Sequence, residues 1–180
     1  MLGIDPGLVA TGYALLEPGS SGLAVVDTGV IATAGDLGLP ARVQLIYEGV
    51  HRLLAKHAPT LVVLEDLYAE YKFPRTALLM AHARGVILLA ARQCEVEVTA
   101  LAPAEVKRVV AGNGAAGKAQ IERCMQRLLA LPAPPRPSHV ADALALAFTG
   151  LSRAGTRPRP DRAGVRPPTV VPASRPSLQR

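Results

Sequence analysis

The chain begins with the stretch LGIDPG at residues 2–7, whose pattern predicts the first element of the fold. Its apolar residues predict a short buried strand that ends at Asp5, and Pro6-Gly7 stops that strand. A second apolar run, at residues 61–64, ends in the same way at Glu65. A carboxylate at the tip of a buried strand is costly unless it is paired, solvated or bound to a metal. The two strand tips are therefore candidate functional positions.

A histidine and an aspartate further along the chain add to this set. His139 and Asp142 stand at positions i and i+3 at the start of the last expected helix, so they share one face of its first turn. Carboxylates with one imidazole suit Mg²⁺ or Mn²⁺. The four residues together predict a metal site, whereas Asp5 alone is equally consistent with an ordinary turn residue.

Apolar patterns and chain breakers predict an α/β fold. The expected strands are 2–5, 11–17, 23–33, 61–64 and 95–101, and the expected helices are 40–57, 74–92, a short one from 103 to the break at 112–114, 117–130, and 138–152 with Ser138 as its N-cap. Three hairpin-type strands followed by alternating strands and helices describe a mixed five-stranded sheet flanked by helices. In that layout the first and fourth strands can lie side by side, which brings Asp5 and Glu65 to one edge.

Length and charge indicate one folded domain with a basic extension. A chain of 180 residues with 49% hydrophobic content can bury one core. Acids and bases balance over residues 1–150, so the net charge of +6 comes from the seven arginines of residues 151–180. We expect one folded domain at 1–152 and a disordered, Pro/Arg-rich tail at 153–180. Within the domain, an acidic first part and a basic region at 68–136 suit an enzyme that acts on a polyanion.

Other sequence signals exclude several classes of protein. Cys94 and Cys124 are isolated, which predicts neither a zinc site nor a disulfide framework. No apolar run reaches the roughly 18–20 residues of a membrane span, and no leader pattern precedes the first strand. These observations predict a cytoplasmic, reduced protein without a membrane partner.

Taken together, these motifs resemble RuvC, the bacterial Holliday junction resolvase family, over about residues 1–152. The motifs that carry the resemblance are Gly3-Ile4-Asp5-Pro6-Gly7, Thr11-Gly12-Tyr13, Glu65 after its strand, Ala83-Arg84-Gly85 and Ala141-Asp142-Ala143-Leu144-Ala145. The resemblance implies a ribonuclease H-like fold, a homodimer, and cleavage of four-way DNA junctions with up to two Mg²⁺ or Mn²⁺ ions per subunit. It also implies the RuvAB branch-migration complex as a partner.

The resemblance assigns roles to individual residues. It makes Asp5, Glu65 and Asp142 the catalytic acids, and it places His139 at a fourth position that is a carboxylate in some members and a histidine in others. Lys107 and Lys118 match phosphate-contacting lysines of the family. A solvated surface lysine, or a capped surface histidine at position 139, is the alternative reading in each case.

A loop after Glu65 matches a DNA-contacting loop of the family. Tyr68 matches an aromatic residue that stacks on an unpaired base, with Phe73 a weaker candidate for stacking and Arg75 for a phosphate contact. A half-buried loop tyrosine is the alternative for Tyr68.

Small residues mark one stripe of the expected helix 74–92. Ala77, Ala81 and Gly85 recur at i, i+4 and i+8. Spacing alone fits packing against the protein's own sheet equally well, and the resemblance favours a helix–helix contact in a homodimer.

Three competing functions also fit parts of the sequence. Residues 112–118 match most of a nucleotide-binding P-loop, but Ala119 lacks the hydroxyl group that the motif uses on Mg²⁺. The N-terminal motif also resembles the first phosphate loop of sugar kinases and actin-like ATPases, which need two such domains. A DNA-binding structural protein without catalysis is the third alternative.

Overall fold

The protein, described here by a computed structural model over residues 1–20, 22–66 and 74–155, is built around one mixed sheet. The sheet has five strands in the order β3-β2-β1-β4-β5. Their bounds are β1 Leu2–Asp5, β2 Ala10–Gly19, β3 Gly22–Ala32, β4 Leu61–Glu65 and β5 Glu97–Leu101. β2 is antiparallel to both β1 and β3, whereas β4 runs parallel to β1 and to β5. The expected pairing of the first and fourth strands is confirmed.

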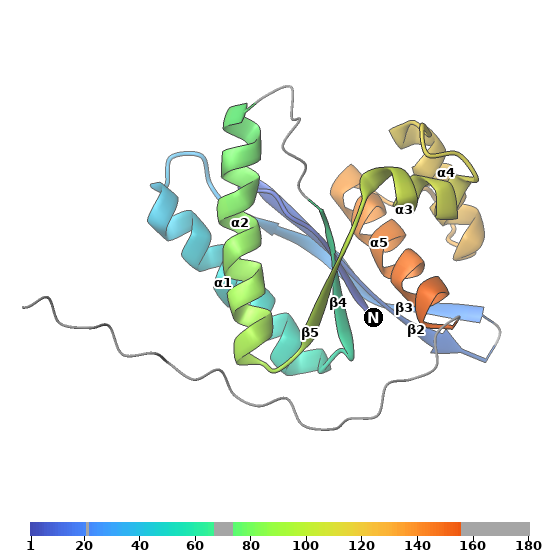
Figure 1. The fold of residues 1–180 in the computed structure, drawn as a ribbon, viewed down its shortest axis with the longest axis horizontal. Helices are drawn as coiled ribbons and strands as arrows, with labels where there is room; N and C mark the ends of the chain where they lie inside the picture. The colour runs from blue at the N-terminus through green and yellow to red at the C-terminus, as the bar shows by residue number, and fades with distance from the viewer. Residues whose placement is uncertain (21, 67–73, 156–180) are drawn as a thin grey trace, which may run out of the picture.

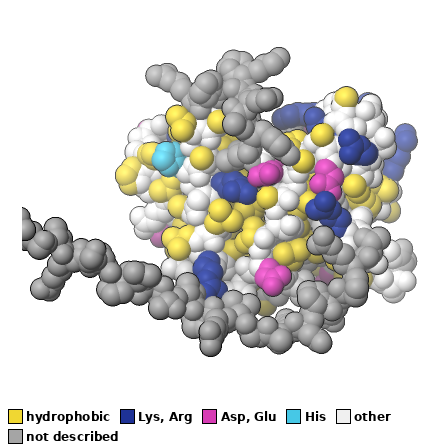
Figure 2. All heavy atoms as spheres, viewed as in Figure 1, with side chains coloured by type: hydrophobic (Ala, Val, Ile, Leu, Met, Phe, Trp, Pro, Cys, Tyr) yellow, Lys and Arg dark blue, Asp and Glu magenta, His cyan; other side chains and the backbone are white. Residues whose placement is uncertain are grey.

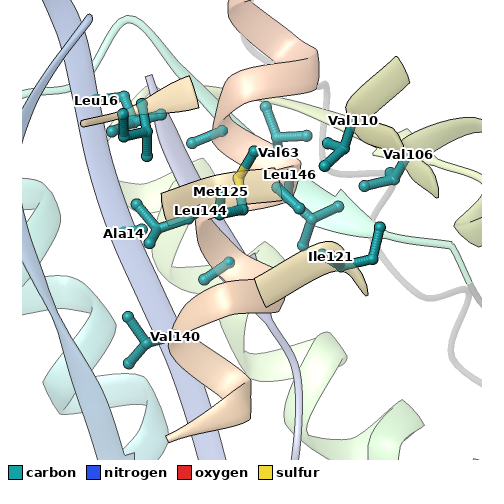
Figure 3. Close-up of a cluster of buried hydrophobic side chains, with 14 of the residues drawn as sticks. Ala14, Leu16, Val63, Val106, Val110, Ile121, Met125, Val140, Leu144 and Leu146 are labelled. Carbon is teal, nitrogen blue, oxygen red and sulfur yellow. The ribbon is translucent and has the colours of Figure 1, made fainter. Parts of the chain in front are cut away.

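Helices cover both faces of this sheet (Figure 1). The helices are α1 Leu39–His57, α2 Pro74–Gln93, α3 Pro103–Ala111, α4 Lys118–Leu128 and α5 Ser138–Ala154. α1 and α2 pack on one face around a core that includes Ile4 and Ile87. α3, α4 and α5 pack on the other face, where Met125 and Leu144 lie in a second core (Figure 3). Each core is made almost entirely of aliphatic side chains, as the near absence of aromatic residues requires.

The ends of several helices and strands differ from the expected ones, and backbone conformation explains two of these differences. Ser138 is not the N-cap of α5, because Pro137 holds that position with extended φ and ψ angles and no side-chain cap bond forms. β5 begins at Glu97 rather than residue 95, since Glu95 has a φ of 55° and belongs to the turn after α2. α5 extends to Ala154, two residues beyond the expected end of the domain. Its Arg153 lies 2.5 Å from the Glu105 carboxylate, which ties the last turn of α5 to α3.

The small-residue stripe of α2 does not pack on the sheet. In the described part of α2 the buried residues that face the core are Ala83, Ile87, Ala90 and Ala91, whereas Ala81 and Gly85 are exposed. A Cβ added at Gly85 would meet no atom within 4 Å. Of the two explanations for this stripe, packing against the protein's own sheet is therefore wrong.

A search of the helices in the described part of the chain found none long and apolar enough to cross a membrane.

Candidate active site

Asp5 and Glu65 lie at the tips of neighbouring strands, as the sequence predicted. β1 and β4 pair in parallel with Ile4 opposite Leu64, so the next residue of each strand follows at the same edge of the sheet. The Asp5 side chain is only 11% exposed, and Glu65 is half-buried. Two carboxylates thus meet at the point where a buried parallel pair of strands ends.

Two glycines let α5 bring its first turn to the same point. A Cβ at Gly12 would lie 2.2 Å from the His139 carbonyl oxygen, and one at Gly3 would lie 2.1 Å from that of Ala143. Only glycine allows the helix backbone to approach β1 and β2 this closely. The close approach sets His139 and Asp142 beside Asp5.

His139 forms a hydrogen bond with Asp5 across 134 positions of the chain. The distance from His139 Nδ1 to Asp5 Oδ2 is 2.7 Å. This bond raises the pKa of His139 above its usual value, against the effect of burial, because the carboxylate favours the charged imidazolium. His139 therefore takes up a proton more readily than a free imidazole does, and it is the hydrogen-bond partner of the buried Asp5.

The other two carboxylates repel one another in this site. Burial and, to a smaller extent, the charges of Asp5 and Asp142 raise the pKa of Glu65 to about 7, against the opposing effect of Lys107 and Lys118. Burial and Asp5 also raise the pKa of Asp142. Carboxyl groups with raised pKa values, such as those of Glu65 and Asp142, keep their protons to higher pH. A bound cation would displace these protons.

A pocket of about 450 Å³ contains all four of these residues, together with Lys107 and Lys118. Lys107 lies on α3, and Lys118 is the first residue of α4. The two lysines face the acidic centre from the α3–α4 side. Arg75 belongs to the first turn of α2, whereas Tyr68 and Phe73 lie outside the described residues.

Three side chains brace the loop between β1 and β2, and the sequence analysis named only one of them, Thr11. The Thr33 hydroxyl donates to the Leu8 carbonyl oxygen at 2.6 Å, and Arg42 Nε donates to Thr33 Oγ1 at 2.8 Å. The Thr11 hydroxyl closes the same loop by donating to the Gly7 carbonyl at 2.7 Å. Thr11 was visible as part of a motif, whereas Thr33 and Arg42 sit in segments without a chemical signature.

The Ala83-Arg84-Gly85 motif has a local explanation. Arg84 Nη2 lies 3.7 Å from Asp66 Oδ1, directly after Glu65. The motif thus connects α2 to the strand end that carries Glu65.

The pocket also has an apolar wall that sequence reasoning missed. Val9 from the β1–β2 loop and Leu79 and Met80 from α2 line the same pocket as the acids. Val9 is 66% exposed, which is unusual for a valine beside a charged centre. Apolar side chains are also interspersed with acidic and basic ones on the face shown in Figure 2.

The carboxylates and the imidazole of this pocket are chemically suitable ligands for a hard divalent cation. Their side chains are not arranged as a preformed coordination site. Within residues 1–20, 22–66 and 74–155, no three acidic, histidine or cysteine side chains gather in a group that could hold an ion. His139 Nδ1 is directed at Asp5 instead of at a shared point. Mutual repulsion among three carboxylates is what a divalent cation would relieve. Asp5, Glu65 and Asp142 are the residues that would hold it, with His139 as the fourth candidate ligand.

The fold and the site define a nuclease of the ribonuclease H-like class, with carboxylates on adjacent central strands and on the last helix. A family model for the crossover junction endodeoxyribonuclease RuvC matches residues 1–150. The chain belongs to the RuvC family.

Individual relatives agree with this assignment. A RuvC from Rhodopirellula baltica is 44% identical over 150 residues, which cover 83% of this chain and 84% of the relative. The structure of Thermus thermophilus RuvC in complex with a Holliday junction substrate superimposes with a TM-score of 0.78 at 33% identity, over 86% of this chain and 95% of that one. A yeast mitochondrial Holliday junction resolvase shares the fold at 13% identity, with a TM-score of 0.58 over 82% of this chain and 77% of that one.

The P-loop reading is wrong, because α3 rather than a strand precedes residues 112–118.

Proposed function

We propose that this protein resolves four-way DNA junctions by metal-dependent hydrolysis of phosphodiester bonds. The observation that carries the proposal is the convergence of Asp5, Glu65, Asp142 and His139 in one pocket flanked by Lys107 and Lys118. This arrangement places acidic ligands at the centre and cations around them, as cleavage of a polyanionic backbone requires. The junction as substrate follows from membership of the RuvC family.

The chain's own residues orient and charge the reaction centre. Asp5 occupies the central position, since both strand pairing and its bond to His139 fix its carboxylate. Lys107 and Lys118 attract the DNA backbone and lower the cost of ionising Glu65. Mg²⁺ or Mn²⁺, up to two per subunit, would supply a water of lowered pKa and stabilise the leaving 3′ oxygen. His139 must be neutral to bind metal, so low pH should weaken the site.

A homodimer would provide the second cut. The exposed stripe of α2 combines Ala81 and Gly85 with Leu78 and Leu89, which are 64% and 50% exposed. An apolar helix face with small residues suits a two-fold contact with the same helix of a second copy. Two active sites related by that axis would nick opposed strands symmetrically.

The remaining roles rest on the family alone. Tyr68 and Phe73 would stack on bases near the crossover, and Arg75 would contact a phosphate. The RuvAB complex would deliver junctions in the cytoplasm during recombination and repair. Residues 1–152 would form the nuclease domain, and 153–180 would add charge for DNA.

Cleavage of a synthetic junction by the purified protein tests this function. We expect symmetric nicks with Mg²⁺ or Mn²⁺, none with EDTA, and little cutting of linear duplex. Asp5→Asn, Glu65→Gln and Asp142→Asn should each lower the rate by more than about 100-fold, beyond the cost typical of outer partners of metal ligands. Their junction binding should remain.

Asp36→Asn, an exposed acid of the β3–α1 loop, is the matched control and should cut normally. Cleavage that persists in EDTA, or normal rates in two of the three site variants, would refute the proposed chemistry.

A further inference from the structure

The outer edge of β3 is an unpaired strand edge with few of the features that usually protect one. In the described part of the chain, β3 pairs with β2 and with no other strand. Over residues 22–32 it has no proline, no lysine and no arginine, and its one charge is Asp27. That carboxylate already binds His57 at 2.8 Å and Lys56 at 3.2 Å. Natural proteins usually blunt such edges with charges or proline, because an open edge pairs with other strands.

A bulge limits the regular part of this edge. The register with β2 shifts between Leu15 and Leu16, which leaves Val26 without a partner. Beyond the bulge, residues 28–32 pair regularly with residues 10–14. An added strand would find a continuous template only in this second part.

A groove of about 360 Å³ lies beside that template, between β3 and α1. Val30, Ile31 and Ala32 all line it. Successive side chains of a strand point to opposite faces, so three consecutive lining residues mean that the groove reaches the backbone of β3. Tyr13 of β2 also lines it, so the groove extends over the sheet face next to α1. Leu45 and Leu53 of α1 supply its apolar wall.

The groove also carries an unused positive charge. Arg52 lines it, is exposed, and makes no hydrogen bond or ion pair within the described part of the chain. Lys56 lines it as well, with its side chain 67% exposed. No acidic side chain is among the residues that line this groove.

We propose that β3 residues 28–32 and the α1 groove bind an extended segment of a partner protein that alternates apolar and acidic residues. Its backbone would extend the sheet by one strand, which is a common mode of peptide recognition. Its apolar side chains would fill the groove against Leu45 and Leu53, and an acidic one would pair with Arg52. A nucleic acid has no amide backbone to continue the sheet. A second copy of this protein is disfavoured as the occupant, because its own groove carries the same basic side chains and the two would repel.

The proposal can be tested by selecting a phage library of random decapeptides on the full-length, metal-loaded protein. We expect enriched peptides to alternate apolar and acidic residues. Arg52→Glu should weaken a selected peptide by at least about 10-fold, as expected for loss of one charge-assisted bond. The peptide should slow hydrogen exchange at residues 28–32. Arg92→Glu, at an exposed position of α2, is the control and should bind the peptide normally.

Other outcomes would overturn the proposal. Absence of enrichment, peptides without an acidic bias, or exchange protection outside residues 28–32 would each refute it. Loss of junction affinity in Arg52→Glu with peptide binding unchanged would assign Arg52 to DNA phosphate. Protection of residues 28–32 by self-association at micromolar concentration would assign the edge to a second copy. Because peptide binding and hydrogen exchange are measured without a DNA junction, these results are separable from the test of the nuclease function.

Discussion

Asp5 is the residue on which the site depends. It lies between β2 and β4, binds His139, and contributes to the raised pKa of both Glu65 and Asp142. The sequence predicted that these four residues would meet, because strand tips and the start of a helix are defined by local pattern. It could not predict the bond between Asp5 and His139, since side-chain pairing across 134 positions depends on how α5 seats on the sheet.

Glu65 should make the metal-free protein less stable as pH rises. Its pKa is raised from 4.5 to about 7, so the folded protein holds this proton more tightly than the unfolded chain. Stability therefore falls as pH rises from about 4.5 to 7 and stays low above that range. Glu65→Gln cannot ionise, so it should exceed the wild type at pH 8 by up to about 3 kcal/mol. Urea unfolding in EDTA measures the difference.

The wild type and Glu65→Gln at low pH provide the control for this measurement. Near pH 4 both proteins carry a neutral side chain at position 65, so their free energies of unfolding should converge. A constant difference between pH 4 and pH 8 would show that Glu65 ionises normally.

The position of α5 against the sheet depends on the absence of a side chain at Gly12 in β2. Gly12→Ala would place a Cβ 2.2 Å from the His139 carbonyl oxygen, so α5 must move away from the sheet. We expect a loss of about 3 kcal/mol or more in unfolding free energy, together with loss of cleavage, because His139 and Asp142 move with the helix. Urea unfolding and junction cleavage measure the two effects.

Gly35→Ala is the matched control, because an added Cβ there meets nothing within 4 Å. It should keep both stability and activity. An active, stable Gly12→Ala protein would mean that α5 can lie further from the sheet without loss of stability or cleavage.

The exposed face of α2 should hold two copies together. Leu89→Glu places a charge on the apolar stripe without touching the core, since Leu89 is half-exposed. We expect the variant to sediment as a monomer at micromolar concentrations where the wild type is a dimer, with its circular dichroism unchanged. Glu95→Gln, beyond the end of α2, should leave the dimer intact. Wild-type protein that sediments only as a monomer would remove the dimer from the proposal.

For the protein as a whole, the C-terminal arginines should add charge to DNA binding and nothing to chemistry. Arg153 belongs to α5 and pairs with Glu105, so the informative deletion is 156–180 rather than 153–180. It removes six arginines. Each lost phosphate contact lowers the slope of log K against log salt by about 0.9. We expect weaker binding to junction and duplex alike in salt titrations, with cleavage preference unchanged. An identical slope before and after deletion would mean that these arginines do not touch DNA.

Pattern alone predicted the sheet, its flanking helices and the acidic centre, because apolar runs and breakers are local signals. The sequence pattern did not predict features that depend on contacts between segments distant in the chain. Nothing in the sequence marks Arg42 as a brace for the β1–β2 loop, or Val9 as an exposed apolar wall. Ser138 looked like a cap, but Pro137 already holds extended backbone angles there.

The contact between β1 and α5 has a consequence for how the protein is made. Gly3 and Gly12 receive a helix that leaves the ribosome more than a hundred residues later, so a nascent chain cannot seat α5 until translation of the domain is nearly finished. Until then Asp5 lacks both His139 and Asp142. A ribosome-bound or prematurely terminated fragment therefore carries only Asp5 and Glu65 of the acidic centre. On the proposed mechanism we expect such a fragment not to cut DNA, so that the enzyme becomes able to damage a chromosome only once its domain has been synthesised in full.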